Sequence, residues 1–519
     1  MRILKKALCF LLLLSLITAA TVSCSRQIAV GDLYKPTRAD FNPSSFKPAP
    51  ADYTITVLTI SQTGDFISAD HPARRALEEL TGYKIRLEYI LNANYSESIN
   101  TRLASRNLPG LITVTGNTMP IVQAAQWGAF WDITDVYELY PNLAQADKGV
   151  MSNISIEGRN YGIYRQRDFP RSGMVYREDW LAKLGLQVPK TLDDLYNVLR
   201  AFTYNDPDGN GRQDTFGMNW TGAYLGPFNN LAVMHGAPNR FGIANGQLRP
   251  WFEYDEFFEA MTFSKRLYDE GLINRDFAAT STGDWAQAFA RGQAGWHIDC
   301  ADEASRSAVR LRDNGLMTQA QFDAGALVGV TGLLANKKGE YRVWPQNDGH
   351  QGYVAISTAT AKTREELHYY LDFMNKLNSP EGITLLNWGV EGTDYRKLPN
   401  GYVEAIQGAP TKEGLNQFRM FGVGGATMEP NAYQRKHMAV FDEITPYAIV
   451  NPVTPIALMS PTWTSRSSSL DVIISDSVVN FIMGNIDRAG FEREKARWYS
   501  EGGTQALSEL QAAYDASQK

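Results

Sequence analysis

The stretch Tyr53-Thr-Ile-Thr-Val-Leu-Thr-Ile60 is a β-branched, apolar run of strand length, and the polar loop Ser61-Gln62-Thr63-Gly64-Asp65 follows it directly. The next predicted elements are a helix, a strand, a second helix and a third strand, over residues 72–80, 83–89, 96–105 and 111–115. Alternating strands and helices of this kind are typical of a parallel sheet with crossover helices. The N-terminal part of the chain therefore predicts an α/β fold.

The same pattern predicts where a ligand would bind. In open parallel sheets, ligands lie beyond the carboxyl ends of the strands. The loops at 62–65 and 116–118 follow the first and third predicted strands. Asp65 and Asn117 are therefore candidate ligand-binding residues.

Length and charge exclude several classes of protein. The chain has 519 residues, 44% of them hydrophobic and 20% charged, which is ordinary globular composition for two or more domains. Its 50 Lys and Arg residues against 56 Asp and Glu residues give a net charge of −6. An acidic chain is a poor partner for phosphate backbones, so we expect no nucleic-acid binding. Three cysteines cannot form a disulfide scaffold.

The N-terminus has the pattern of a secretory signal, expected over residues 1–23. Arg2, Lys5 and Lys6 precede an apolar stretch that is short for a membrane span. Thr21-Val22-Ser23-Cys24 resembles the lipobox of bacterial lipoproteins, which implies lipidation of Cys24 and a position on the extracellular face of the cell membrane. An ordinary cleaved signal with an incidental cysteine is the alternative. Residues 24–51 are proline-rich without hydrophobic periodicity, which predicts a tether.

A loop rich in acidic and amide side chains has the oxygen spacing of a calcium loop. Side-chain oxygens of Asp206, Asp208, Asn210 and Asp214 fall at positions 1, 3, 5 and 9, and the carbonyl of Arg212 falls at position 7. Position 12 departs from the EF-hand pattern because it is a glycine, so further oxygens must come from water or neighbouring groups. The alternative is a surface turn that binds no metal.

Several longer motifs carry a resemblance to a known family. The segment Met174-Val-Tyr-Arg-Glu-Asp-Trp-Leu-Ala-Lys-Leu-Gly-Leu-Gln-Val-Pro-Lys-Thr-Leu-Asp-Asp-Leu195 resembles a stretch of the solute-binding lipoproteins of bacterial ABC importers, extracellular family 1. Within that family the chain looks most like the branch for oligosaccharides and aldouronates. Further similar segments cover residues 103–110, 387–395, 481–484 and 512–515, although Gly110 stands where the family usually has Asp.

The resemblance implies a fold, a partner and a metal. The expected fold is periplasmic-binding-protein-like, type II, with two α/β lobes, a hinge near Tyr161-Gly-Ile-Tyr164 and a ligand cleft between the lobes. The expected boundaries are 52–165 plus 326–395 for lobe one and 166–325 plus 396–519 for lobe two. The expected partners are an oligosaccharide and the membrane subunits of an ABC permease, with the receptor itself a monomer. Similarity to the alginate-binding proteins assigns a structural calcium to the loop at 206–214.

Carbohydrate recognition needs flat apolar faces beside polar groups that pair with hydroxyls. Several of the 11 tryptophans are placed in this way, although the core is the more common position for any one of them. The residues that we expect in the cleft, together with the two loop residues named above, are Trp388, Glu391, Tyr395, Asn219, Trp220, Trp285 and Trp296. For an acidic sugar, Arg165 and Arg167 beside the expected hinge are the candidate cations.

The sequence predicts a binding protein and no enzyme. It contains no HExxH, GxSxG or GxxxxGK[ST] motif. A pair of glycosidase carboxylates need not be close in the sequence, so a lipid-anchored polysaccharide-degrading enzyme is the alternative from a different class. Within the binding class, a receptor for peptides or another non-sugar ligand is the alternative, because aromatic clefts also suit such ligands.

Overall fold

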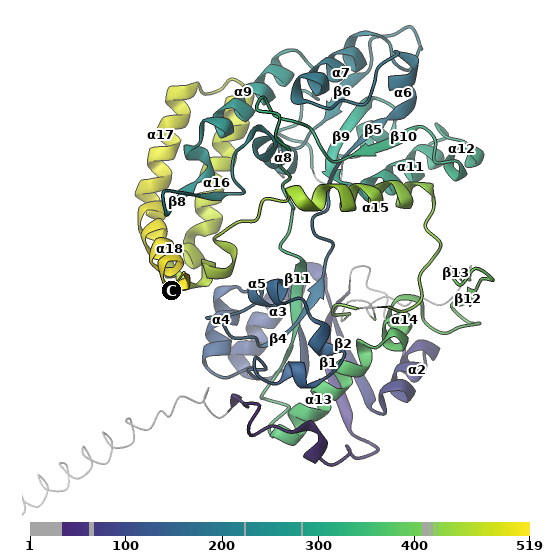
Figure 1. Cartoon of the computed structure of the whole chain (residues 1–519), viewed down its shortest axis with the longest axis vertical. Coiled ribbons are helices and arrows are strands. Elements are labelled where there is room, and N and C mark those ends of the chain that lie inside the picture. The colour runs from purple at the N-terminus through teal and green to yellow at the C-terminus, as the bar shows by residue number, and fades with distance from the viewer. Residues whose placement is uncertain are drawn as a thin grey trace, which may run out of the picture.

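The chain folds into two α/β bodies joined by passages of extended chain. The computed structural model describes residues 34–61, 67–222, 225–281, 284–406, 415, 419–422 and 424–518. The lower body in Figure 1, lobe one, contains a five-stranded sheet, and the upper body, lobe two, contains a four-stranded sheet. The predicted fold class, two α/β lobes, is confirmed.

Lobe one is built on a mixed sheet with the strand order β2-β1-β3-β11-β4. Strand β1 is parallel to β2 and β3, whereas β11 is antiparallel to β3 and β4. The strands are β1 (Thr54–Ser61), β2 (Lys84–Leu91), β3 (Leu111–Val114), β4 (Gly162–Gln166) and β11 (His350–Ile356). The helices are α2 (Pro72–Thr81), α3 (Asn92–Ser105), α4 (Met119–Gln126), α5 (Lys148–Asn153), α13 (Arg364–Leu377) and α14 (Pro380–Trp388).

The sequence explains why these elements form. Every residue of β1 after the first is buried, as expected for a β-branched strand that is covered on both faces. Gly82 ends α2 in the left-handed conformation, with φ of 76°. Thr363 and Glu366 form a capping box at the start of α13.

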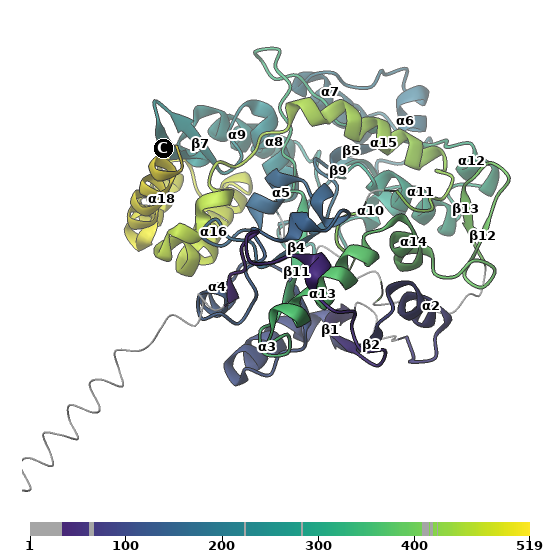
Figure 2. The same cartoon turned by 60° about the horizontal axis from the view of Figure 1, so that its bottom comes forward.

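Lobe two has the strand order β10-β5-β9-β6, with β5 (Ser172–Arg177), β6 (Phe216–Asn219), β9 (Ala294–Cys300) and β10 (Val328–Thr331). Its helices are α6 (Glu178–Lys183), α7 (Leu192–Tyr204), α8 (Gly226–His235), α9 (Asp255–Asp269), α10 (Gln287–Ala290), α11 (Glu303–Asp313), α12 (Gln319–Asp323) and α15 (Ala432–Ile444). The C-terminal helices α16 (Pro461–Ile482), α17 (Arg488–Trp498) and α18 (Thr504–Ser517) lie together at one side of this lobe in both views (Figures 1 and 2).

Two hairpins and several short helical turns complete the fold. The hairpins pair β7 (Phe241–Ala244) with β8 (Gln247–Pro250), and β12 (Tyr395–Lys397) with β13 (Val403–Ala405). Short 3-10 helices cover Pro43–Ser45, Tyr137–Leu139, Leu143–Gln145, Trp251–Glu253, Thr445–Tyr447 and Thr454–Met459, and a π-helical turn covers Tyr499–Gly503.

Two passages of chain between the lobes run side by side and form a hinge ribbon, residues 167–171 and 345–349. The backbone N–H of Arg167 donates to the carbonyl of Gly349 at 3.1 Å, and that of Arg171 donates to the carbonyl of Pro345 at 3.4 Å. The amide of Asn347 donates to the carbonyl of Asp168 at 2.9 Å. The ribbon directly follows β4, which contains most of the predicted hinge segment 161–164, so the crossing begins a few residues later than the prediction.

Both expected boundaries in the second half of the chain differ from the structure. Strand β10 pairs with β5 and so belongs to lobe two, although the boundary at 326 assigned it to lobe one. Met420 and Phe421 are buried in the core of lobe one, although the boundary at 396 assigned them to lobe two. The two differences have the same physical cause. A short strand or loop belongs to the lobe whose sheet or core covers its apolar side chains.

The predicted tether is in part a strap that docks on lobe one. Phe41 is 1% exposed and belongs to the core of this lobe. The ring of Phe46 stacks on His368 of α13, with centroids 5.1 Å apart, and Asp40 pairs with Arg364 at 2.8 Å. Residues 34–50 therefore pack against the lobe, and the earlier residues of the expected tether lie outside the described part of the chain.

The strap contributes to the stability of lobe one. Phe41→Ala removes a buried ring, and we expect it to lower the free energy of unfolding by about 3–5 kcal/mol. Urea denaturation followed by circular dichroism measures this change, with the exposed Lys47→Ala on the same strap as the control. Equal midpoints for the two variants would show that the strap does not pack on the lobe in solution.

Candidate functional site

The strand directions bring the ligand-binding ends of both sheets to the hinge. In lobe one, β11 begins at the hinge and pairs antiparallel with β3, so the carboxyl ends of β3 and its parallel neighbour β1 face the hinge. In lobe two, β5 begins at the hinge with Ser172 opposite Cys300, so the carboxyl ends of β9 and its parallel neighbour β6 also face it. The space beside the hinge ribbon is therefore the expected position of a ligand.

One hollow in this space, here called the hinge cavity, has a volume of about 590 Å³. It lies between α5 and the end of β4 in lobe one, the hinge ribbon, and residues 450–455 of lobe two. Its lining includes amides, carboxylates, a guanidinium group and apolar side chains, namely Asp147, Asn153, Tyr164, Gln166, Arg167, Phe169, Asp348, Val450, Asn451 and Thr454. Both lobes contribute to this wall, as a ligand that closes the lobes requires.

Asp348 connects the two lobes within this cavity. Its backbone carbonyl accepts a hydrogen bond from the amide of Asn153 in lobe one at 3.0 Å. Its carboxylate accepts a hydrogen bond from the hydroxyl of Thr454 in lobe two at 3.3 Å. Burial raises the pKa of Asp348, while the hydroxyl of Thr454 and the positive charge of Arg240 act in the opposite direction.

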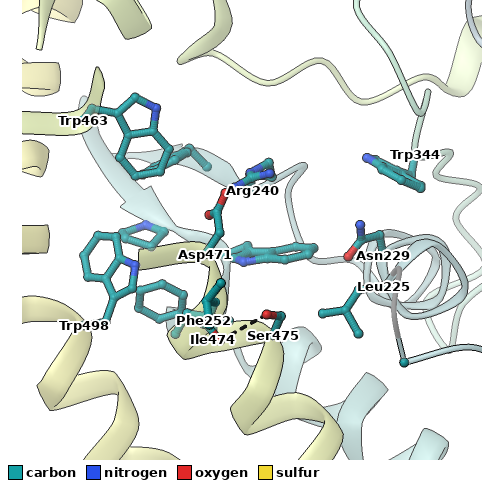
Figure 3. Close-up of a pocket in the computed structure, with 15 residues that line it drawn as sticks. Leu225, Asn229, Arg240, Phe252, Trp344, Trp463, Asp471, Ile474, Ser475 and Trp498 are labelled. Carbon is teal, nitrogen blue, oxygen red and sulfur yellow. Dashed lines mark hydrogen bonds and ion pairs between the residues drawn. The ribbon is translucent and has the colours of Figure 1, made fainter. Parts of the chain in front are cut away.

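A second hollow, the aromatic cavity, has a volume of about 280 Å³ and lies between α8, the β7–β8 hairpin and α16 (Figure 3). Several aromatic side chains line it, namely Phe241, Trp251, Phe252, Trp344, Trp463 and Trp498. Trp344 reaches it from the chain just before the hinge ribbon, and Trp463 reaches it from the first turn of α16. In Figure 3 these two indoles lie on opposite sides of the cavity, with Arg240 and Asp471 between them.

Arg240 lines the aromatic cavity and interacts electrostatically with the hinge cavity. Its guanidinium forms an ion pair with Asp471 of α16, and both side chains are more than 40% exposed. Its charge also acts on Asp348 in the hinge cavity. Trp344 of the aromatic cavity directly precedes the hinge ribbon that lines the hinge cavity, so the two cavities together form the candidate site, which combines flat indole faces with planar polar groups.

Trp220 and Trp296, predicted to line the cleft, are core residues. Both are 0% exposed. The ring of Trp296 stacks on Tyr176 with centroids 5.0 Å apart, and the ring of Trp220 meets Phe277 edge to face. This corrects the prediction, because Trp296 lies on the central strand β9 and Trp220, which follows the edge strand β6, packs against Phe277, so the core of lobe two covers both indoles.

Asn219 and Trp285 lie together at the end of β6 that faces the hinge. The amide of Asn219 bonds to the carbonyl of Trp285 and to the ring of His297. The indole of Trp285 donates to the carbonyl of Asn219 at 3.2 Å and lies 4.4 Å from the ring of His297. Asn219 is 1% and Trp285 6% exposed, so the two hold this edge in place from within.

The three residues predicted from the 387–395 segment lie on lobe one, and none of them lines either cavity. Trp388 ends α14 half-buried, and its indole donates to the carbonyl of Ala426 at 2.7 Å. Glu391 is exposed and pairs with Lys397 at 2.8 Å. Tyr395 is 5% exposed within β12.

The predicted loop and arginine residues have separate positions. Asn117 is half-buried, and its amide oxygen accepts a hydrogen bond from the hydroxyl of Tyr353 at 2.9 Å. Asp65 and Cys24 lie outside the described residues. Arg167 lines the hinge cavity, whereas Arg165 is 4% exposed and donates to the carbonyl of Gln351 at 3.2 Å.

The predicted metal loop is a tight turn whose oxygens are engaged by its own N–H groups. The carboxylate of Asp206 accepts from the backbone N–H of Gly209, Asn210 and Gly211 at 3.0–3.1 Å. The amide nitrogen of Asn210 donates to Asp208 at 2.7 Å and to Asp214 at 3.1 Å. Rotation of that amide by a half-turn would place its oxygen beside the two carboxylates, a donor set that fits calcium.

Among the described residues, no group of three or more His, Cys, Asp or Glu side chains is placed to hold a metal ion. The carboxylates of Asp206, Asp208 and Asp214 are therefore not gathered into such a group in this structure. A metal assignment here therefore depends on the turn as a whole, including Asn210 and Arg212.

The main residues that sequence reasoning missed are Trp344, Trp463, Arg240 and Asp348. They span 223 positions, from Arg240 to Trp463, and meet only because the chain crosses between the lobes more than once. Pro461, two residues before Trp463, is a sequence signal for the start of a helix. It places the indole in the first turn, where it can face outward. No signal in the sequence singles out Asp348 from the other aspartates.

Three comparisons with known proteins agree with this architecture. The model of the family described as "Bacterial extracellular solute-binding protein" matches residues 65–384. Lipoprotein LipO of Bacillus subtilis (strain 168) is 34% identical over 477 residues, which cover 89% of this chain and 93% of LipO. The polygalacturonan/rhamnogalacturonan-binding protein YtcQ of the same organism is 30% identical over 452 residues, which cover 85% of this chain and 88% of YtcQ.

Among solved structures, the alginate-binding protein AlgQ2 without calcium ion has the same fold, with a TM-score of 0.65 at 19% identity, over 90% of this chain and 99% of that one. In the described part of the chain, no helix is both long and apolar enough to cross a membrane. The chain belongs to the bacterial extracellular solute-binding protein family, and it is a binding protein and not an enzyme.

Proposed function

We propose that this protein is the extracellular receptor of an ABC importer and that it holds an oligosaccharide between its lobes. The observation that carries the proposal is the hinge cavity, which both lobes line, next to an aromatic cavity with two indoles, Trp344 and Trp463. Pyranose rings present flat C–H faces that pack on indoles, and their hydroxyls pair with amides, carboxylates and guanidinium groups. The name of the relative YtcQ, a binding protein for pectic polysaccharides, supports a carbohydrate ligand.

The ligand would act by changing the balance between an open and a closed form. Contacts with both lobes are required, because a ligand shifts this balance only through its different affinity for the two forms. Affinity about 1,000-fold higher for the closed form would shift the balance by roughly 4 kcal/mol. The permease subunits would then recognise the closed form and receive the ligand chemically unchanged.

We also propose that lipid on Cys24 holds the receptor at the outer face of the membrane. The lipobox-like segment at 21–24 supports this, as does the name of the relative LipO, a lipoprotein. Because the strap packs on lobe one, the attachment would act on lobe one and leave lobe two to move about the hinge.

A titration screen tests the class of ligand. Intrinsic tryptophan fluorescence of the purified protein is measured against a panel of oligosaccharides and a panel of peptides. Saturable quenching or a spectral shift with an oligosaccharide is the expected result, because Trp344 and Trp463 would lose contact with water on binding. Saturable binding of peptides, with no response to any oligosaccharide, would show that the proposed ligand class is wrong.

Trp344→Ala should raise the dissociation constant for the selected oligosaccharide at least tenfold, which corresponds to about 1.4 kcal/mol. The physical reason is the loss of a stacking face at the junction of the hinge and the aromatic cavity. Calorimetric titration measures the change. The matched control is Trp127→Ala, because Trp127 is 63% exposed and lines neither cavity. Similar dissociation constants for the two variants would remove Trp344 from the site.

The same titration with Trp388→Ala tests whether the site extends to the end of α14, as the sequence predicted. The predicted role remains a proposal, and a tenfold weakening with this variant would support it. An unchanged dissociation constant would confine the site to the two cavities beside the hinge.

We propose calcium for the loop at 206–214, where it would be structural. Asp206, Asp208, Asn210, Asp214 and the carbonyl of Arg212 would hold it. A ligand that binds only the folded state, at a hundred times its dissociation constant, stabilises that state by about 2.7 kcal/mol. Excess EDTA should therefore lower the melting temperature by several degrees, and excess calcium should restore it.

Differential scanning fluorimetry measures this effect. Asp214→Asn is the diagnostic variant, because it removes a charge from the loop without changing its size, and it should melt at the same temperature in EDTA and in calcium. A wild-type protein that shows no difference between EDTA and calcium would contradict the metal assignment.

A further inference from the structure

The charged groups of the candidate site do not favour an anionic ligand. The charged side chains that line the two cavities are two arginines, Arg167 and Arg240, and three aspartates, Asp147, Asp348 and Asp471. A site for a polyanionic chain normally presents an excess of arginine or lysine, because guanidinium groups pair with carboxylates in a bidentate geometry. The described lining has no such excess.

Three of these five groups already have partners that use their charge or their oxygens. Arg240 forms an ion pair with Asp471 of α16, which neutralises both groups. A carboxylate oxygen of Asp147 accepts the backbone N–H of Val150 at 2.9 Å and caps the start of α5. The other carboxylate of the hinge cavity, that of Asp348, neither caps a helix nor forms an ion pair in the described structure.

The carboxylate of Asp348 has unused capacity to accept hydrogen bonds. In the described structure it accepts one from the hydroxyl of Thr454, at 3.3 Å. An ionised carboxylate has about four acceptor positions. Arg240 is near enough to act on it electrostatically, but that arginine pairs with Asp471. The direction of the pKa of Asp348, which burial raises, agrees with a carboxylate that nearby positive charge does not fully compensate.

We propose that Asp348 is a specificity-determining residue, which accepts hydrogen bonds from hydroxyl groups of an uncharged oligosaccharide and disfavours a uronate chain. The inference rests on the proposed function and names the charge class of its ligand. Hydroxyl donors satisfy the carboxylate, whereas a second carboxylate brought into a partly buried site is repelled and loses its hydration. Because Asp348 contacts both lobes, the same hydrogen bonds also favour the closed form.

The test compares ligands that differ only in charge. Tetragalacturonate is compared with its carboxyl-reduced form, and a mannuronate tetramer is compared with its own carboxyl-reduced form, by calorimetric titration of the full-length mature protein. Each pair has the same length and linkage, so the comparison isolates the carboxylates. We expect the uncharged member of a bound pair to bind at least about tenfold more tightly.

Two variants test whether Asp348 causes the preference for the uncharged ligand. Asp348→Asn keeps the size of the side chain and removes its charge, and it should weaken the uncharged ligand about fivefold or more and bring the affinities of the pair close together. Asp269→Asn is the matched control, because Asp269 is exposed on α9 and pairs only with Lys265 in the described structure. It should leave both affinities unchanged.

The possible failures are distinguishable. Binding of neither member of either pair, with no saturation in the broader sugar screen, would overturn the proposed function itself. Tighter binding of the uronate member would overturn the inference about Asp348 while the oligosaccharide function stands. A preference for the uncharged member that persists unchanged in Asp348→Asn would also overturn it, and melting curves of both variants confirm that they are folded.

Discussion

Backbone hydrogen bonds hold residues 167–171 beside residues 345–349, and the relation between the two lobes depends on this ribbon. Its bonds from Arg167 to Gly349 and from Arg171 to Pro345 use main-chain groups, so they fix the path of the chain whatever the side chains are. The strands that leave the ribbon, β5 and β11, are antiparallel to strands whose carboxyl ends must then face it. The position of the ligand site follows from this constraint.

The same constraint explains why the candidate site is assembled from distant parts of the sequence. Trp344 and Asp348 lie at or beside the ribbon, Arg240 follows α8, and Trp463 starts α16. Each is placed by a different element, and each of those elements packs against lobe two or the hinge. The hinge cavity also has a wall from lobe one, which includes Asn153 and Gln166, so a ligand there would contact both lobes, as a transport receptor needs.

The sequence predicted the elements better than their assembly. β-branched runs such as 54–60 are local signals, and the structure confirms this strand. Trp220 and Trp296 look like ligand residues because they end or occupy strands, but whether a strand residue faces a cleft or a core depends on what covers the sheet. Phe41 was missed in the strap, because a single buried ring has no periodicity.

The central claim is that this receptor closes about the hinge when an oligosaccharide binds. Small-angle X-ray scattering of the purified protein, with and without a saturating concentration of the tightest-binding oligosaccharide, measures it most directly. The account predicts a smaller radius of gyration in the bound state, as the lobes approach each other. A radius that stays the same while tryptophan fluorescence shows saturation would contradict it.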